Sequence, residues 1–357
     1  MSSRFALSQF DFPLAVQCVA LHPASPRDSA RLLVVRLTGD RLEDTRVRDL
    51  PKILRPGDTL VINTTKVFPA RLLGRRSTGG AVEVLLLHAQ GADQWVCLGK
   101  GLPAPDTTHL IRFSRHLTAS VLERRADGTW LLTFSLQGKA FWKEVERIGQ
   151  VPIPPYLKSL AGQKKLRTSY QTVFAKQRGS AAAPTAGLHF TPKLLRELRA
   201  RGVAVVPVTL HVGWGTFAPI RAVDIRQHAM HAEWGKISAA SWKQLQHSKQ
   251  DHGRSQQPHG RIIAVGTTAL RVVEAAARDS AHQGGKWSGW TSIFLKPEDK
   301  LQMVNGLLTN FHLPKTTLFV LVCSMLGTKK AQAVYAEARR REYRWASFGD
   351  AMLILPE

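Results

Sequence analysis

The pattern of hydrophobic and polar positions changes character near residue 150. From about residue 58 to 150, short apolar runs are separated by tight turns, and the first clear helical pattern comes only at "AFWKEVERIG". Two turns are strong hairpin signals: Gly79-Gly80 in "RLLGRRSTGGAVEVLLL" and Asp127-Gly128 in "LTASVLERRADGTWLLTFS". Short strands with regular turns predict a small barrel or sandwich in this region.

After the Pro-rich connector "VPIPPY", apolar strands alternate with helical patterns. "TPKLLRELRARG" predicts a helix with Thr191 as N-cap, Pro192 in the first turn and Gly202 at its end. "VAVVPVTLHV" predicts a buried strand, and "RIIAVGTT" predicts another that leads into the helix "ALRVVEAAARD". "TTLFVLVCSML" and "KKAQAVYAEARRREY" are two further helical patterns. This alternation indicates a layered α/β domain.

The N-terminal part of the chain matches the α/β pattern better than the barrel pattern, because "ARLLVVRL" and "RPGDTLVIN" are apolar strands. We therefore predict the fold class α/β, with a larger layered domain that is discontinuous over residues 1–65 and 151–357. A small β-barrel domain, residues 66–150, is inserted into it. The polar stretch 247–260 is predicted to be an exposed loop.

Composition narrows the classes of protein. The chain has 357 residues, more than one hydrophobic core usually takes. No apolar run reaches the ~18–20 residues of a membrane helix, and the start lacks a secretory signal pattern. Three widely spaced cysteines favour a reducing compartment, so a cytoplasmic location is expected. The formal charge of +24 attracts polyanions such as nucleic acid, although solubility is the alternative explanation.

Standard motifs are missing from the sequence. It contains no P-loop, no dinucleotide fingerprint, no C-x-x-C and no H-E-x-x-H. His228 and His231 are three residues apart and could share a helical face, but further metal ligands are not identifiable, so hydrogen bonding or packing is the simpler interpretation. We predict no metal site.

Four segments with small and hydroxyl residues follow apolar strands or precede helices. They are "GSAAAPTAGLHF" (179–190), "TLHVGWGTF" (209–217), "VGTTALR" (265–271) and "LTNFHLPKTTL" (308–318). Ligands of open α/β sheets bind at the carboxyl ends of strands, so these segments are predicted to converge on one crevice. Thr267 and Thr268 lie where the first amides of a helix could hold a carboxylate or phosphate. For each segment alone, an ordinary turn or helix cap is the alternative.

These segments, with "FDFPL", "RPGDTLVINTTKVFPARLLG", "GGAVEVLLL" and "YRWASFGDAML", closely resemble the S-adenosylmethionine:tRNA ribosyltransferase-isomerase family of queuosine biosynthesis. The motifs occur in family order from Phe10 to Leu355. The resemblance implies transfer and isomerisation of the ribosyl moiety of S-adenosylmethionine onto 7-aminomethyl-7-deazaguanine at the tRNA wobble position. It also implies an α/β domain with an inserted barrel, and S-adenosylmethionine as a consumed substrate rather than a cofactor. The implied tRNA partner would account for the positive charge of the chain. A monomer is expected.

Given that reaction, the sequence offers several candidate residues. His189 and His211 are candidates for the general base or acid, with His312 as a third, and the alternative is a hydrogen bond to adenine or to the methionine carboxylate. Asp350 is a further candidate base or sulfonium partner, with a helix cap as the alternative. Arg271 is expected to clamp a carboxylate or a tRNA phosphate. The segments that the resemblance places around S-adenosylmethionine supply the remaining predicted binding residues: Ser180, Thr185, Gly187, Phe190, Thr209, Gly213, Gly215, Thr216, Phe217, Thr267, Thr268, Asn310 and Thr317.

The chain departs from the usual family pattern at a few positions. Thr64 and Lys66 stand where the family commonly has aspartate and arginine, and Trp214 replaces a leucine. Two other functions are alternatives. An RNA methyltransferase using S-adenosylmethionine is disfavoured by the missing glycine-rich loop, and a non-catalytic RNA-binding module is disfavoured by the retained His- and Thr-rich loops.

Overall fold

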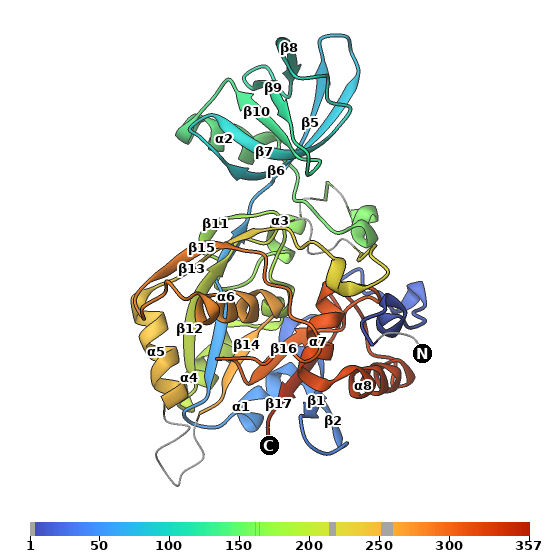
Figure 1. The fold of residues 1–357 in the computed structure, drawn as a ribbon, viewed down its shortest axis with the longest axis vertical. Helices are drawn as coiled ribbons and strands as arrows, with labels where there is room; N and C mark the ends of the chain where they lie inside the picture. Colours follow the sequence, from blue (N-terminus) through green and yellow to red (C-terminus); the bar gives the residue numbers. More distant parts are fainter. Residues whose placement is uncertain (1–3, 161, 164, 214–218, 251–259) are drawn as a thin grey trace. The chain divides into compact units, whose positions relative to one another are not determined.

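The computed structural model describes residues 4–160, 162–163, 165–213, 219–250 and 260–357 (Figure 1). The chain divides into two compact units. Unit 1 contains Met1–Thr65, Thr172–Gln177 and Pro184–Glu357, and unit 2 contains Lys66–Gln171 and Arg178–Ala183. The α/β class with an inserted barrel is thereby confirmed, whereas the boundaries at 65/66 and 150/151 stay predictions.

A nine-stranded mixed sheet runs through unit 1. Its spatial order is β15 (Trp287–Thr291), β13 (Glu233–Ile237), β12 (Ala204–Leu210), β3 (Thr59–Asn63), β14 (Ile262–Val265), β16 (Gly306–Asn310), β17 (Ala351–Leu355), β1 (Arg31–Arg36) and β2 (Leu42–Arg46). The four central strands β12, β3, β14 and β16 are parallel neighbours. β3, β14 and β16 are buried along their whole length, which explains why their sequences are mostly apolar.

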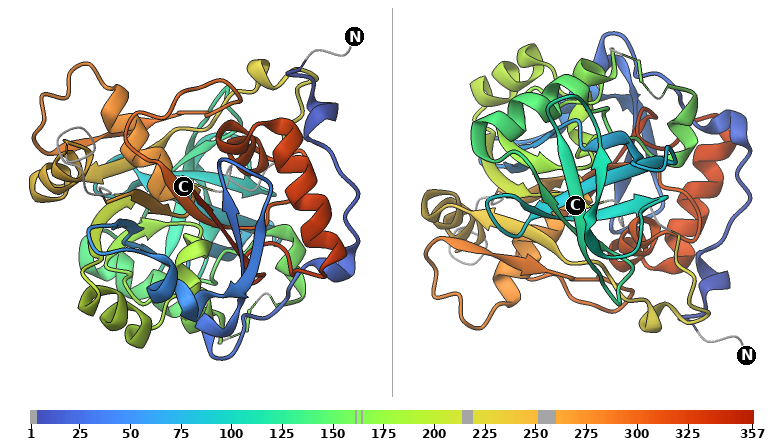
Figure 2. Two further views of the ribbon diagram at one scale, coloured as in Figure 1. Left: turned by 90° about the horizontal axis from the view of Figure 1, so that it is seen from below. Right: turned by 90° about the horizontal axis from the view of Figure 1, so that it is seen from above.

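Successive residues of these strands pack into two different cores, one on each face of the sheet. In β3, Val61 belongs to the first core, and Leu60 and Ile62 belong to the second. The first core is completed by the helices α5 (Ala239–Gln250), α6 (Thr267–Arg278), α7 (Thr317–Leu326) and α8 (Thr328–Arg340). The second core is completed by α1 (Leu50–Ile53) and α4 (Pro192–Ala200). The predicted layers are therefore present (Figure 2).

A closed six-stranded barrel forms most of unit 2. Its order is β10 (Trp130–Phe134), β7 (Gln94–Lys100), β6 (Ala81–Ala89), β5 (Arg71–Arg76), β8 (Asp106–Arg112) and β9 (Thr118–Arg124). The helix α2 (Gly138–Ile148) contributes Phe141 and Val145 to the barrel core. The short helix α3 (Leu166–Ser169) follows, and β4 (Thr65–Val67) pairs with β11 (Gln177–Ser180) in a separate two-stranded sheet.

The helix cap, helix end and hairpin turns predicted from residues close together in the sequence are present in the structure. The Thr191 side chain accepts a hydrogen bond from the Leu194 amide at 3.1 Å, and Gly202 takes a positive φ of 79° just after α4. Both predicted hairpins form, β5–β6 around Gly79 and β9–β10 around Gly128.

One possibility left open by the sequence is excluded, and one local prediction is wrong in part. His228 and His231 lie on no common helical face, because a short 3-10 helix ends at Gln227 and residues 228–232 are irregular. The start of the expected loop, residues 247–250, is the last turn of α5; residues 251–259 lie outside the described ranges. Polar residues there continue a helix whose apolar side chains Trp242 and Leu245 are already anchored in the core.

Within the described ranges, no helix is both long and apolar enough to cross a membrane. Cys18, Cys97 and Cys323 are free thiols.

Candidate functional site at the carboxyl edge of the central strands

The loops that follow β12, β3, β14 and β16 leave the sheet at one edge. Parallel strands place their carboxyl ends on the same side of the sheet. The residues that directly follow these four strands therefore lie at that edge: 64–65, 211–213, 266–268 and 311–312. A short 3-10 helix, η6 (Thr185–His189), contacts β16 and brings part of the 179–190 segment to the same edge. The described parts of the four predicted segments in unit 1 are thus brought together.

Asn63, the last residue of β3, links three of these loops and was not identified from the sequence. Its fully buried amide donates to the Leu210 carbonyl at 3.0 Å and to the Thr268 hydroxyl at 3.1 Å. Its carbonyl oxygen accepts from the amides of Leu210 and Thr65, each at 3.1 Å. A buried amide with all these partners fixes the spacing of the loops.

His211 follows β12 and is half-buried. Its Nδ1 lies 2.8 Å from the Thr65 hydroxyl, and its ring stacks on Trp234 with centroids 5.3 Å apart. Burial lowers the pKa of His211 to about 4, so the ring is neutral at pH 7. Neither Thr65 nor Trp234 was predicted to take part.

His189 ends η6 and is held by a chain of hydrogen bonds. Thr185 donates to the Asn310 side-chain oxygen at 3.0 Å, and the Asn310 amide nitrogen lies 3.2 Å from His189 Nε2. An amide nitrogen can only donate, so Nε2 accepts and the neutral ring carries its proton on Nδ1. Burial lowers the pKa of His189 to about 4, and the charge of Asp350 opposes that shift.

Asp350 and His312 are buried and already engaged by protein groups. The Asp350 carboxylate accepts from the backbone amides of Arg31 and Arg344, at 3.1 and 2.9 Å, and from the Arg344 side chain at 3.0 Å. His312 Nε2 lies 2.8 Å from the Thr309 hydroxyl, and burial lowers the pKa of His312 to about 3. These contacts favour structural roles for both residues over proton transfer.

Arg271 forms a buried ion pair with Glu233, and its Nε donates to the Ile293 carbonyl at 3.2 Å. Glu233 also accepts from the Gly213 amide at 2.7 Å, so the pair holds the backbone at Gly213. Arg271 Nη2 is buried without a hydrogen-bond partner among the described residues. If Arg271 binds a carboxylate or a tRNA phosphate as predicted, Nη2 is the nitrogen available for it, because Nε and Nη1 already bind protein groups.

The remaining predicted binding residues are distributed unevenly. Thr209 contacts the Thr64 hydroxyl at 3.2 Å, and Thr267 and Thr317 are the buried first residues of α6 and α7. Phe190 is fully buried and packs against Phe174 in the second core of the sheet. A Cβ at Gly187 would come within 2.7 Å of the Phe174 ring. Ser180 belongs to unit 2, and Trp214, Gly215, Thr216 and Phe217 lie outside the described residues.

The three neutral histidines predict a dependence of stability on pH. Their pKa values in the folded chain, about 4, 4 and 3, lie below the ordinary 6.5 that applies after unfolding. Because the unfolded chain binds protons first, this contribution to stability is complete above pH 6.5 and is lost as pH falls. Thermal unfolding midpoints should fall already between pH 6.5 and 4.5, before most carboxylates titrate. His312→Gln should reduce that fall; an unchanged pH profile would contradict it.

Within the described ranges, no group of three or more His, Cys, Asp and Glu side chains is arranged to hold a metal ion. The residues that sequence reasoning missed are Asn63, Thr65, Glu233 and Trp234. "NTT" directly after an apolar strand was a usable signal for the first two, because polar residues at the carboxyl end of a parallel strand face the ligand edge. Nothing in the local sequence marks Glu233 or Trp234.

Comparison with known proteins assigns the family. A family model described as "Queuosine biosynthesis protein" matches residues 7–354. Two relatives named S-adenosylmethionine:tRNA ribosyltransferase-isomerase are 44% identical (Pelotomaculum thermopropionicum) and 45% identical (Ruegeria pomeroyi), each over 98% of this chain and 99% of the relative. A crystal structure of S-adenosylmethionine tRNA ribosyltransferase from Thermotoga maritima is 31% identical, with a TM-score of 0.56, over 97% of this chain and all of that one. The chain therefore belongs to the queuosine biosynthesis protein family, in which these relatives carry the name S-adenosylmethionine:tRNA ribosyltransferase-isomerase.

Proposed function

We propose that this protein transfers and isomerises the ribosyl moiety of S-adenosylmethionine onto 7-aminomethyl-7-deazaguanine at the wobble position of tRNA. The products are epoxyqueuosine-tRNA, adenine and methionine. The main support is the similarity to relatives of that name over almost the whole chain. S-adenosylmethionine is a consumed substrate in this proposal, with no cofactor or metal, and the protein acts as a cytoplasmic monomer.

The chemistry requires a base, a proton donor and a site that excludes water. The sulfonium acidifies the ribose 5′ C–H bond, and a base that removes this proton gives an ylide that expels adenine. The amine of the tRNA base then attacks the anomeric carbon, and methionine leaves as the epoxide closes. Adenine departs more easily when a positioned group donates a proton to it.

His211 suits the role of the base best among the three histidines. It is more accessible than His189 and His312, which are 5% and 8% exposed. The Thr65 hydroxyl also has the Gln177 carbonyl as an acceptor, at 3.5 Å. When Thr65 donates there, it accepts from His211 Nδ1–H and leaves Nε2 unprotonated. A pKa near 4 makes this nitrogen available at pH 7, although only weakly basic.

His189 suits the role of a hydrogen-bond donor to the departing adenine. The Asn310 amide fixes its tautomer with the proton on Nδ1, so the ring offers an N–H rather than a lone pair. Burial keeps the pKa of His189 at about 4 despite the opposing charge of Asp350, so the neutral ring would stabilise the departing adenine by a hydrogen bond from Nδ1–H without giving up that proton.

Product analysis tests the proposal. Purified protein is incubated with S-adenosylmethionine and tRNA that carries the aminomethyl precursor, and the released small molecules are separated by chromatography. Adenine and methionine are expected in equal amounts, with one modified ribose added to the tRNA. S-adenosylhomocysteine in their place would indicate a methyltransferase, and no turnover of correctly loaded tRNA would indicate a binding module.

A further inference from the structure

A groove of about 760 Å³ lies on the surface of the barrel and has no role in the chemistry described above. Its walls come from β5, the start of β6, the ends of β7 and β8, and the turn after β8. Four exposed cations line it: Arg75, Lys100, Arg112 and Arg115. All of these residues belong to unit 2.

β5 and β8 approach each other closely beside this groove. β5 and β8 pair through two residue pairs, Arg75 with Arg112 and Arg76 with Ile111. Gly74 faces the Phe113 ring, and a Cβ at that glycine would come within 2.7 Å of the ring and 2.9 Å of the Arg112 carbonyl. Phe113 therefore packs against bare β5 backbone and forms an apolar wall beside the cations.

Arg75 and Arg112 are directly opposite each other on neighbouring antiparallel strands. Like charges at such positions repel and destabilise the pair of strands. An anion bound between the two guanidinium groups would remove that repulsion. The arrangement therefore favours an anionic ligand over a purely structural role.

The groove cations also differ from other arginines of the barrel in their partners. Arg71 forms a two-pronged pair with Glu83, at 2.8 and 2.9 Å, and Arg147 pairs with Glu144. Among the carboxylates whose side chains the structure describes, none forms an ion pair within 4.0 Å with Arg75, Lys100, Arg112 or Arg115. Glu83 also lines the groove; it pairs with Arg71 and lies directly opposite Lys100 on β7. Glu83 thus offsets part of the charge of Lys100, and the excess positive charge of the groove comes mainly from Arg75, Arg112 and Arg115.

We propose that this groove binds the sugar-phosphate backbone of the tRNA substrate. The inference rests on the proposed function, which supplies an RNA partner, and on a chain with 24 more cationic than acidic side chains. Arginine and lysine hold phosphates through charge-assisted hydrogen bonds, and such contacts make affinity depend on salt. The groove would thus contribute affinity for RNA without reading its sequence.

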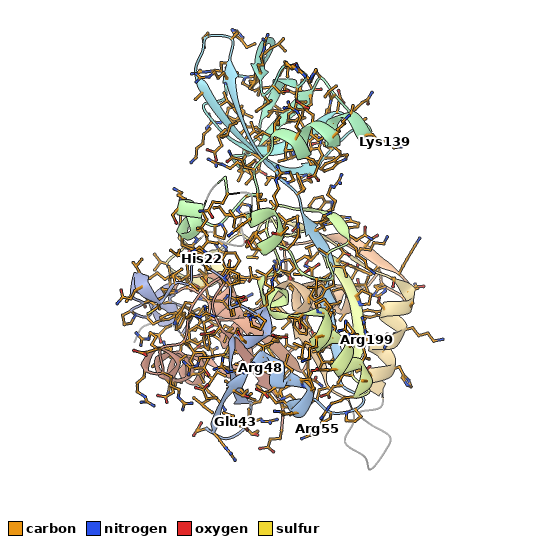
Figure 3. All side chains as sticks on the ribbon, turned by 180° about the vertical axis from the view of Figure 1, so that it is seen from behind. His22, Glu43, Arg48, Arg55, Lys139 and Arg199 are labelled. Carbon is orange, nitrogen blue, oxygen red and sulfur yellow. The ribbon has the colours of Figure 1, made fainter. Side chains whose placement is uncertain are left out.

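The test compares groove variants with a matched cation elsewhere on the barrel. Lys139 is exposed on α2, where Figure 3 shows it pointing away from the unit, and it does not line the groove. Binding of an unmodified tRNA transcript is followed by fluorescence anisotropy between 50 and 200 mM KCl, for wild type, Lys100→Ala, Lys139→Ala and the triple variant Arg75→Ala/Lys100→Ala/Arg112→Ala.

The triple variant is expected to bind the transcript at least about tenfold more weakly at 50 mM KCl. The slope of the logarithm of affinity against the logarithm of salt concentration should be smaller in magnitude by about 2 to 3, because each phosphate contact that is made releases roughly one counterion. Lys100→Ala should weaken binding by about threefold on the same basis, and Lys139→Ala should behave as wild type. Equal affinity and slope in wild type and the triple variant would overturn the proposal, as would an equal loss in Lys139→Ala.

Catalytic measurements separate this proposal from the proposed function. The KM for precursor-loaded tRNA should rise in the triple variant, while the KM for S-adenosylmethionine stays at the wild-type value. If the wild-type protein releases no adenine, the proposed function fails, yet transcript binding still decides the role of the groove. If adenine is released and tRNA binding is unaffected by the triple variant, the groove proposal alone fails. The triple variant is expected to have a midpoint temperature of unfolding equal to or higher than that of wild type, because it lacks the repulsion between Arg75 and Arg112.

Discussion

Replacing His211 with alanine is expected to lower kcat for adenine release by about 10²- to 10⁴-fold, the usual contribution of a positioned general base. The reason is geometric: His211 is the half-buried histidine at the carboxyl edge of the central strands, and Thr65 orients its ring. The measurement is the rate of adenine release at saturating S-adenosylmethionine and precursor-loaded tRNA. The affinity for a tRNA transcript should stay within about twofold of wild type, since the change removes no phosphate-binding cation.

Two variants at Thr65 provide the control for this prediction. Thr65→Val removes the hydroxyl that holds Nδ1 but keeps the shape of the side chain, so it should lower kcat with little effect on KM. Thr65→Ser keeps the hydroxyl and should recover most of the lost rate. A His211→Ala enzyme with more than a tenth of wild-type kcat would contradict the assignment of the base. A still larger loss in His189→Ala than in His211→Ala would move that role to His189.

Sequence patterns predicted the layers and the barrel because these follow from contacts along the chain. The α4 cap at Thr191 and the hairpin at Gly128 involve residues only a few positions apart. Buried parallel strands such as β3 and β14 are recognisable because both of their faces are apolar. The convergence of the polar loops then follows from parallel strands alone, before any side-chain contact is known.

The polar contacts that build the site are long-range and could not be read from spacing. Glu233 pairs with Arg271 across 38 positions of sequence, and Asn63 bonds Thr268 across 205. No periodicity marks such partners, because they meet only after the sheet order β13-β12-β3-β14 is set. For the same reason the sequence suggested Asp350 as a base or sulfonium partner, because nothing nearby in the sequence marks the donors from Arg31 and Arg344. In the structure, its carboxylate accepts three hydrogen bonds from these two residues.

Asp58→Ala is expected to lower the free energy of unfolding of the α/β unit by about 3 to 5 kcal/mol, because it leaves a buried arginine without its counter-charge. Asp58 is fully buried just before β3, and Arg261, just before β14, is 3% exposed. The carboxylate accepts from the Arg261 side chain at 2.6 and 3.1 Å, from the Arg261 amide at 2.8 Å and from the Arg55 amide at 2.8 Å. One side chain thus joins the starts of two adjacent central strands. Chemical denaturation, followed by circular dichroism, measures the loss.

Two further variants separate the buried charge from the loss of a contact. Arg261→Met removes the cation but leaves Asp58 with both backbone amides, so it should destabilise less than Asp58→Ala. Lys52→Ala breaks the exposed pair with Asp49 and should cost less than about 1 kcal/mol, as surface pairs do. A loss below about 1 kcal/mol for Asp58→Ala would show that β3 and β14 do not depend on this carboxylate. In the expected case, the candidate site at the carboxyl ends of these strands depends on a salt bridge at their starts, since β3 and β14 pair in unbroken register from Thr59 and Ile262 to Ile62 and Val265.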